Sequence, residues 1–138
     1  MSTLTKVLEK NVAEIEKNAD MKEGRFRLGH HLMPPVGWLN DPNGLCWYKG
    51  KYHVFFQYAP FDVEGGLKFW GHYTSVDLVD WKYEGTALYP DSPYDCHGVY
   101  SGSALVEDEK MHLFFTGNVK IDGDYDYINE GRETSTLH

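Results

Sequence analysis

The sequence predicts an all-β fold, namely the first blade and part of the second blade of a β-propeller, preceded by one amphipathic helix. Three observations support this prediction: a series of short aromatic and β-branched runs, turn-forming residues between those runs, and an internal repeat. An aromatic share of 15% and 14 glycines also favour β-structure.

Residues 3–18 are predicted to form the helix, because apolar side chains recur on one helical face and charged side chains fall opposite. The apolar positions are Leu4, Leu8, Val12 and Ile15. The pattern stops after Asn18, and short β-like runs begin at Arg25. We therefore predict an N-terminal helix and linker over residues 1–24 and an incomplete β-propeller domain over residues 25–138.

Seven short runs after the linker are predicted to be strands, and no second helical pattern interrupts them. They cover residues 45–48, 52–58, 70–76, 81–83, 86–89, 98–106 and 111–117. Lys49 and Gly50 separate the first two runs and predict a hairpin there.

The internal repeat aligns KYHVFFQY at residues 51–58 with KMHLFFTG at residues 110–117, at an offset of 59 residues. At the same offset, LCW at residues 45–47 aligns with ALV at residues 104–106. A repeat of about four short strands is typical of a propeller blade, so residues 41–89 are predicted to form one blade and residues 98–117 to begin a second. Since each blade buries its faces against its neighbours, we expect the uncovered faces to cause self-association.

Composition and charge restrict the partners. A formal net charge of −8 argues against nucleic-acid binding, which depends on clusters of Lys and Arg. The N-terminal residues contain no apolar run long enough for a signal sequence or a membrane span. Cys46 and Cys96 are interpreted as free thiols in a reducing compartment, so we expect a cytoplasmic protein without a membrane partner.

The stretch VGWLNDPNGL, residues 36–45, contains a dense run of turn-forming residues with a carboxylate at Asp41. One interpretation is that this run is only a turn, in which Pro42 fixes φ and Gly44 accepts a positive φ. The other is that the turn presents Asp41 at the mouth of an inner strand, close to Trp38. A carboxylate beside an aromatic ring suits sugar binding.

Five motifs carry a resemblance to a known family. The runs GWLNDPNGL, YKGKYHVFFQYAP, FWGHYTSVDLVDW, GVYSGSA and HLFFTG occur in this order. Together they resemble the β-fructofuranosidases, the invertase-like enzymes of glycoside hydrolase family thirty-two, over residues 25–132. Within that family the chain is most similar to the bacterial sucrose-6-phosphate hydrolases.

The resemblance implies a five-bladed propeller with a central funnel and hydrolysis of β-fructofuranosidic bonds with retention of configuration. It implies that Asp41 is the nucleophile, kept ionised by hydrogen bonds from turn amides and Asn40. The matching substrate-binding positions are Asn40, Gln57, Trp70, Tyr100 and Ser101, with Trp70 filling a funnel wall. The substrate class is sucrose, sucrose 6-phosphate or a short fructan, and no cofactor is expected. Gly65-Gly66 replaces a Trp of many relatives, so the leaving-group subsite is expected to differ.

A retaining glycosidase also needs an acid/base carboxyl, which the family takes from an E-C motif, and the family adds an R-D-P motif. Neither motif occurs in these 138 residues, so we expect the chain alone to be inactive. Other acids are interpreted as solvated charges, namely Asp62, Glu64, Asp95 and Glu107. A non-catalytic module that binds sucrose or fructan is the alternative function, and transfer of the fructosyl group to another sugar is a third possibility.

Acidic residues near the C-terminus partly match a calcium-binding EF-hand loop, at Asp122, Asp124, Asp126 and Glu133. Tyr127 occupies the position that requires Gly, and a strand pattern precedes the loop. The segment is therefore predicted to be an acidic surface loop, and no metal site is expected.

Overall fold

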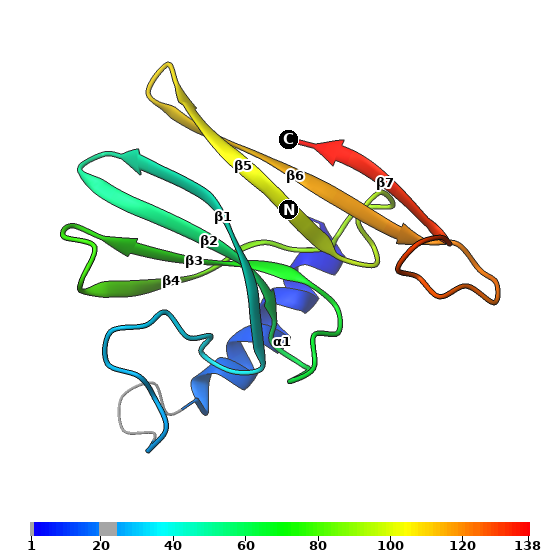
Figure 1. The fold of residues 1–138 in the computed structure, drawn as a ribbon, viewed down its shortest axis with the longest axis horizontal. Coiled ribbons are helices and arrows are strands. Elements are labelled where there is room, and N and C mark those ends of the chain that lie inside the picture. The colour runs from blue at the N-terminus through cyan, green and yellow to red at the C-terminus, as the bar shows by residue number, and fades with distance from the viewer. Residues whose placement is uncertain (1, 20–24) are drawn as a thin grey trace.

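The computed structural model describes residues 2–19 and 25–138. They form one helix and seven strands (Figure 1): α1 (Thr3–Lys17), β1 (Trp38–Tyr48), β2 (Lys51–Ala59), β3 (Phe69–Ser75), β4 (Trp81–Leu88), β5 (Val99–Glu107), β6 (Lys110–Lys120) and β7 (Arg132–Leu137). The strands make two antiparallel sheets, ordered β1-β2-β3-β4 and β5-β6-β7. These sheets confirm the predicted first blade and part of a second blade, and α1 confirms the helix. The predicted linker ends within residues 20–24, which lie outside the described residues.

The structure differs from the strand predictions at β1, β4 and β7, and β1 begins at Trp38 instead of residue 45. β4 joins the runs predicted at residues 81–83 and 86–89, because its pairing with β3 continues through a register shift. β7 was not predicted, because its sequence, RETSTL, is polar and only half-buried, and it lacks the aromatic and apolar side chains that indicate a strand.

The N-D-P-N-G run is not a turn between strands but an irregular part of β1, which corrects the turn prediction. Asn40 pairs with Gln57 and Pro42 pairs with Phe56, so Asp41 is the extra residue of a β-bulge. A second irregularity follows Asn43, where Gly44 has a φ of 53°. The turn-forming residues therefore bend the strand without reversing it.

The repeat is confirmed as a repeat of strands, since β1 and β2 correspond to β5 and β6. Both hairpin turns have a positive φ at their two central residues, Lys49-Gly50 and Asp108-Glu109, as the right-handed twist of a tight hairpin favours. A stack of rings is repeated as well. Phe55, His72 and His53 stack in the first sheet, whereas Phe114, His138 and His112 stack in the second.

The first sheet is covered on both faces. On one face α1 inserts Val12 among Phe56, Tyr58, Phe69 and Tyr73, which are all buried. Glu16 of the same helix accepts hydrogen bonds from the hydroxyls of Tyr58, at 2.9 Å, and Tyr83, at 2.7 Å. On the other face Phe55 and Trp70 form a second core cluster with Val99 of β5, packed against residues of β6. The two sheets therefore meet through an apolar interface.

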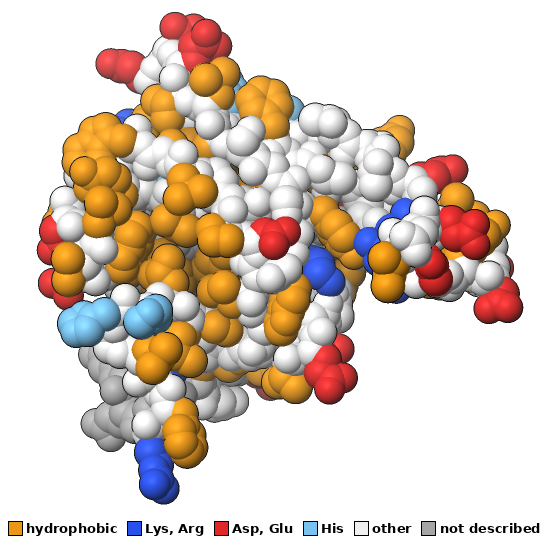
Figure 2. All heavy atoms as spheres, in the orientation of Figure 1, with side chains coloured by type: hydrophobic (Ala, Val, Ile, Leu, Met, Phe, Trp, Pro, Cys, Tyr) orange, Lys and Arg blue, Asp and Glu red, His pale blue; other side chains and the backbone are white. Residues whose placement is uncertain are grey.

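In the space-filling view of Figure 2, hydrophobic side chains gather on the part of the surface over the first sheet, and acidic side chains gather at the tips of the second. Cys46 and Cys96 are free thiols, as predicted. Among the residues that the structure describes, no helix is both long and apolar enough to cross a membrane.

Candidate active site

A cavity of about 450 Å³ opens where β1 of the first sheet meets β5 of the second. It contains five of the six side chains predicted for the site, and Trp70 is the exception. The lining residues are Asn40, Asp41, Gln57, Lys68, Tyr100, Ser101, Thr116 and Arg132. The structure thus brings together residues from both halves of the repeat.

Asp41 and Ser101 occupy equivalent bulges in the two sheets. Ser101 is the extra residue of β5, between the pairs Tyr100–Thr116 and Gly102–Phe115, as Asp41 is in β1. Ser101 Oγ donates a hydrogen bond to Asp41 Oδ2 at 2.6 Å. Because bulges redirect side chains and are frequent beside active sites, the two irregularities aim both groups at the same space.

The buried side chain of Gln57 completes this network. Its Nε2 atom donates to Ser101 Oγ at 2.9 Å, so the Ser101 hydroxyl accepts one hydrogen bond and donates another. Gln57 is only 4% exposed, which restricts its rotamers and, through them, the orientation of the Ser101 hydroxyl. The amide therefore positions the donor that holds the carboxylate.

Asn43 links the same two bulges from below the surface. Its side chain is 3% exposed, its Nδ2 atom donates to the Asp41 carbonyl oxygen at 2.9 Å, and its Oδ1 atom accepts from the Gly102 amide at 3.1 Å. From its sequence context, Asn43 is predicted only to belong to the turn-forming run. In the structure it ties the backbone of β1 to that of β5 beside the carboxylate.

Trp70 does not contact the cavity, which corrects the expectation that it forms a funnel wall. Its side chain is 0% exposed and packs against Phe55 and Phe115 between the sheets. Trp70 Nε1 donates to the Tyr100 carbonyl oxygen at 3.1 Å, so it supports the cavity wall from behind. Burial of Trp70 against the second sheet could not be derived from the FWGHYTSVDLVDW motif alone.

Three lining residues were not predicted: Lys68, Thr116 and Arg132. The repeat contained a signal for Thr116, which corresponds to Gln57 at the offset of 59 residues. No sequence pattern marks Lys68 or Arg132, whose cationic groups lie 5.4 and 5.3 Å from the centre of the Tyr100 ring. Arg132 Nη1 also donates to the Tyr100 hydroxyl at 3.0 Å.

Asp41 provides the one carboxylate among the described residues that line this cavity. Asp62, Glu64 and Glu107 are exposed, as predicted. The prediction for Asp95 was wrong, because its side chain is 2% exposed and its Oδ1 atom accepts hydrogen bonds from the amide and hydroxyl of Ser92. Burial raises the pKa of the Asp95 carboxyl above its usual value.

In the loop between β6 and β7, the Asp126 carboxylate accepts hydrogen bonds from the backbone of the same loop. Asp126 Oδ1 accepts from the backbone amides of Ile128 and Asn129, at 2.8 Å each. Within residues 2–19 and 25–138 no group of three or more potential metal-binding side chains was found.

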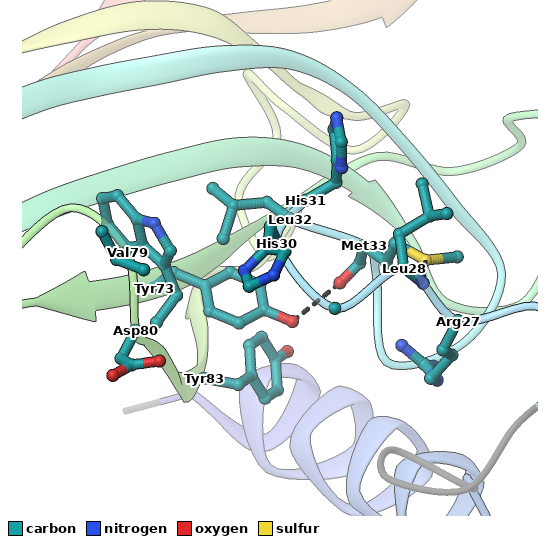
Figure 3. A pocket seen from close by; sticks show the side chains of 12 residues that line it. Arg27, Leu28, His30, His31, Leu32, Met33, Tyr73, Val79, Asp80 and Tyr83 are labelled. Atoms are coloured by element: carbon teal, nitrogen blue, oxygen red, sulfur yellow. Dashed lines mark hydrogen bonds between the residues drawn. The ribbon is translucent and has the colours of Figure 1, made fainter.

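A second cavity, of about 340 Å³, lies where residues 27–33 cross the first sheet (Figure 3). Tyr73 donates from its hydroxyl to the Met33 carbonyl oxygen at 2.7 Å and fastens this segment to β3. Trp81 and Tyr83 of β4 also line the cavity. None of the six predicted site residues contributes to it, so its lining serves to pack the segment and not to present Asp41.

Comparisons with known proteins agree with this geometry. Residues 31–134 match the N-terminal domain of the glycosyl hydrolases of family 32. The chain is 52% identical to a sucrose-6-phosphate hydrolase from Bacillus subtilis over 108 residues, which are 78% of this chain and 22% of that protein. The chain therefore spans about a fifth of the length of this curated relative.

Solved structures show the same similarity. A family-32 β-fructofuranosidase from Bombyx mori, solved as an aspartate-to-alanine mutant in complex with sucrose, has a TM-score of 0.78 and 35% identity, covering 98% of this chain and 26% of that one. A sucrose-6-phosphate hydrolase from Lactobacillus gasseri has a TM-score of 0.75 and 38% identity, covering 92% of this chain and 24% of that one. The chain belongs to glycosyl hydrolase family 32, as part of its N-terminal β-propeller domain.

Proposed function

We propose that this chain supplies the nucleophile half of the active site of a retaining β-fructofuranosidase that cleaves sucrose or sucrose 6-phosphate. The observation that carries the proposal is the exposed carboxylate of Asp41, held at the cavity by Ser101 from the other sheet. Relatives named as sucrose-6-phosphate hydrolases and a relative solved with sucrose support this choice of substrates.

In the proposed reaction, an oxygen of the Asp41 carboxylate attacks the anomeric carbon of the fructosyl ring. The bond from that carbon to the bridging oxygen breaks, and the departing sugar takes a proton from a general acid. Water, deprotonated by the same group acting as a base, then cleaves the fructosyl ester and regenerates Asp41. In this proposal, Ser101 orients the attacking carboxylate to which it donates, and Asn40 and Gln57, which line the same cavity, contact ring hydroxyls.

The general acid is not part of the described cavity. A retaining enzyme needs its second carboxyl about 5 to 5.5 Å from the first. Among the described residues no second carboxyl lines the cavity, and the sequence contains neither an E-C nor an R-D-P motif. We therefore propose that the 138-residue chain binds sugar but does not turn it over by itself.

A non-catalytic module that binds sucrose or fructan is the second candidate, and it is favoured because Asp41 is the one carboxylate among the described residues that line the cavity. The two functions predict different activities for any longer gene product that contains this chain. Turnover in that product supports the enzyme, whereas saturable sugar binding without turnover supports the module.

The test measures fructose released from sucrose and from sucrose 6-phosphate, by the chain and by any longer gene product that contains it. In an active product, Asp41→Asn is expected to lower kcat by about 1,000-fold or more, because the amide cannot form the covalent intermediate. The matched control is Asp62→Asn, the same change at an exposed acid outside the cavity, and it is expected to retain activity. Turnover by the 138-residue chain itself would contradict the proposed absence of the acid, and normal turnover by Asp41→Asn would contradict the role of Asp41.

A further inference from the structure

We propose that a basic cavity beside the Asp41 cavity binds the phosphate monoester of a phosphorylated sugar. It has a volume of about 300 Å³, and its polar lining side chains are Lys68, His97, Tyr100, Lys120 and Arg132. This proposal rests on the proposed function, because it assigns part of the same substrate to residues of this chain.

The two cavities are contiguous. Lys68, Tyr100 and Arg132 line both the cavity that contains Asp41 and the basic cavity. A sugar held beside Asp41 would therefore place a substituent of its leaving part next to the cationic side chains. The Gly65-Gly66 loop forms one wall of the basic cavity, and Lys68 Nζ donates to the carbonyl oxygens of both glycines, at 2.5 and 3.2 Å.

No acid that the structure describes forms an ion pair with a cation of this cavity. Among the described residues, the ion pairs within 4.0 Å involve only Lys51, Lys82 and Glu84, so none involves Lys68, Lys120 or Arg132. This gathering of positive charge contrasts with a chain whose formal net charge is −8. A cluster of cations without ion-paired carboxylates favours the binding of an anion.

The pKa of Lys68 agrees with this interpretation. Burial lowers it, and the positive charges of Arg132 and Lys120 lower it further, whereas Asp62 opposes the shift. A bound phosphate would reverse the repulsion among the three cations, because it places a negative charge among them.

One hydrogen-bond donor of the cavity lacks an acceptor in the part of the chain that the structure describes. Arg132 Nη1 is used by Tyr100, but its buried Nε atom has no partner among the described residues. His97 Nδ1 accepts from the Lys120 amide at 3.0 Å, which places the ring proton of neutral His97 on Nε2. A guanidinium, two ammonium groups and an imidazole N–H form the donor set that recognises a phosphate monoester rather than a neutral sugar hydroxyl.

The experiment measures binding to the 138-residue chain by isothermal titration with sucrose, sucrose 6-phosphate and inorganic phosphate as separate probes. Sucrose 6-phosphate is expected to bind at least about tenfold more tightly than sucrose, because charged hydrogen bonds contribute more than neutral ones. Lys120→Gln is expected to remove most of this difference and to leave sucrose affinity unchanged, since Lys120 lines only the basic cavity. The matched control is Lys110→Gln, an exposed lysine at the other end of β6, which should change neither affinity.

The outcomes separate this proposal from the proposed function. Equal affinities for sucrose and sucrose 6-phosphate, or equal effects of Lys120→Gln and Lys110→Gln, overturn the phosphate site while sucrose binding still supports the sugar cavity. Binding of both phosphate probes that depends on Lys120, without any binding of sucrose, supports the anion site and contradicts the proposed function. Saturation by inorganic phosphate with no added affinity for the sugar ester shows a general anion site and overturns the assignment to substrate.

Discussion

Ser101 Oγ lies 2.6 Å from Asp41 Oδ2, although 60 residues separate the two along the chain. Each residue is the extra residue of a bulge in the first strand of its sheet, so structurally equivalent bulges face each other across the interface, although the sequence repeat at an offset of 59 residues aligns Asp41 with Tyr100. The carboxylate is thus held by the second sheet and not by its own strand. Its position depends on how the two sheets dock.

Ser101→Ala tests this dependence. Removal of the hydroxyl leaves Asp41 without this donor and Gln57 Nε2 without its acceptor, so the free energy of unfolding is expected to fall by about 1 kcal/mol. Urea denaturation followed by tryptophan fluorescence measures the change. Ser103→Ala, at an exposed position of the same strand, should have almost no effect, and equal effects of the two changes would contradict the linking role of Ser101.

Glu16 should anchor α1 to the first sheet. Glu16→Ala removes the acceptor of the Tyr58 and Tyr83 hydroxyls, and Tyr58 is fully buried, so we expect a loss of about 2–3 kcal/mol in the free energy of unfolding. Glu14→Ala makes the same change at an exposed position of the helix and should cost much less. If both variants unfold at the same urea concentration, the anchoring role fails.

His72 should make the chain sensitive to acid. Burial, together with the neighbouring His53, lowers the pKa of His72 from 6.5 to about 4, with a smaller opposing effect of Glu84. The folded state therefore holds a neutral ring that the unfolded state protonates. Stability is fully present above pH 6.5 and falls as the pH drops from 6.5 towards 4, by at most about 1.4 kcal/mol per pH unit for one proton.

Urea denaturation at several pH values between 7.5 and 4.5 measures this slope. The unmodified chain and two histidine variants are compared at one salt concentration, roughly 0.1 M. His72→Gln is expected to flatten the dependence, because glutamine does not titrate. His31→Gln, at an exposed histidine, should keep the slope of the unmodified chain. An unchanged slope in His72→Gln would assign the acid sensitivity to other groups.

Gly71 permits close packing between β3 and the Phe56 ring. A Cβ atom at this position would collide with the ring, which is 1% exposed and cannot move into solvent. Gly71→Ala is therefore expected to destabilise the chain by about 2–3 kcal/mol, as overpacking of a core does. Gly29→Ala is the control, because nothing lies within 4 Å of the corresponding Cβ position, and thermal unfolding should show a large loss only for Gly71→Ala.

The outer face of the second sheet should cause self-association. On this face Leu105 is 49% exposed and pairs with His112. At the repeat offset of 59 residues, these two positions correspond to Cys46 and His53 of the first sheet. Cys46 and His53 lie on the face of the first sheet that the second sheet covers, whereas the equivalent face of the second sheet has no covering sheet among the described residues. Apolar side chains on a blade face that a neighbouring blade would cover are expected to promote association. Sedimentation velocity is expected to show association that rises with concentration and weakens in Leu105→Glu. Val63→Glu, at an exposed loop residue, should not weaken it, and a stable monomer at every concentration would refute the prediction.

Features that repeat locally could be predicted from the sequence. The helix, the hairpin at Lys49-Gly50 and the correspondence of β2 with β6 depend on periodicity and turn chemistry, which are visible in short segments. The resemblance to family thirty-two also selected Asn40, Asp41, Gln57, Tyr100 and Ser101, all of which line one cavity. The polar strand β7 and the bulged path of N-D-P-N-G were missed, because partner strands determine them.

By itself, the sequence determined which residues could carry the chemistry, since side-chain type and the repeat are properties of the chain. The tertiary structure alone decided their surroundings. Docking of the two sheets buries Trp70 behind the wall, brings Ser101 to Asp41, and gathers Lys68, Lys120 and Arg132 beside them from three separate segments. Burial and electrostatic interaction depend on distances in space, and no short-range pattern in the sequence encodes distances between segments so far apart along the chain.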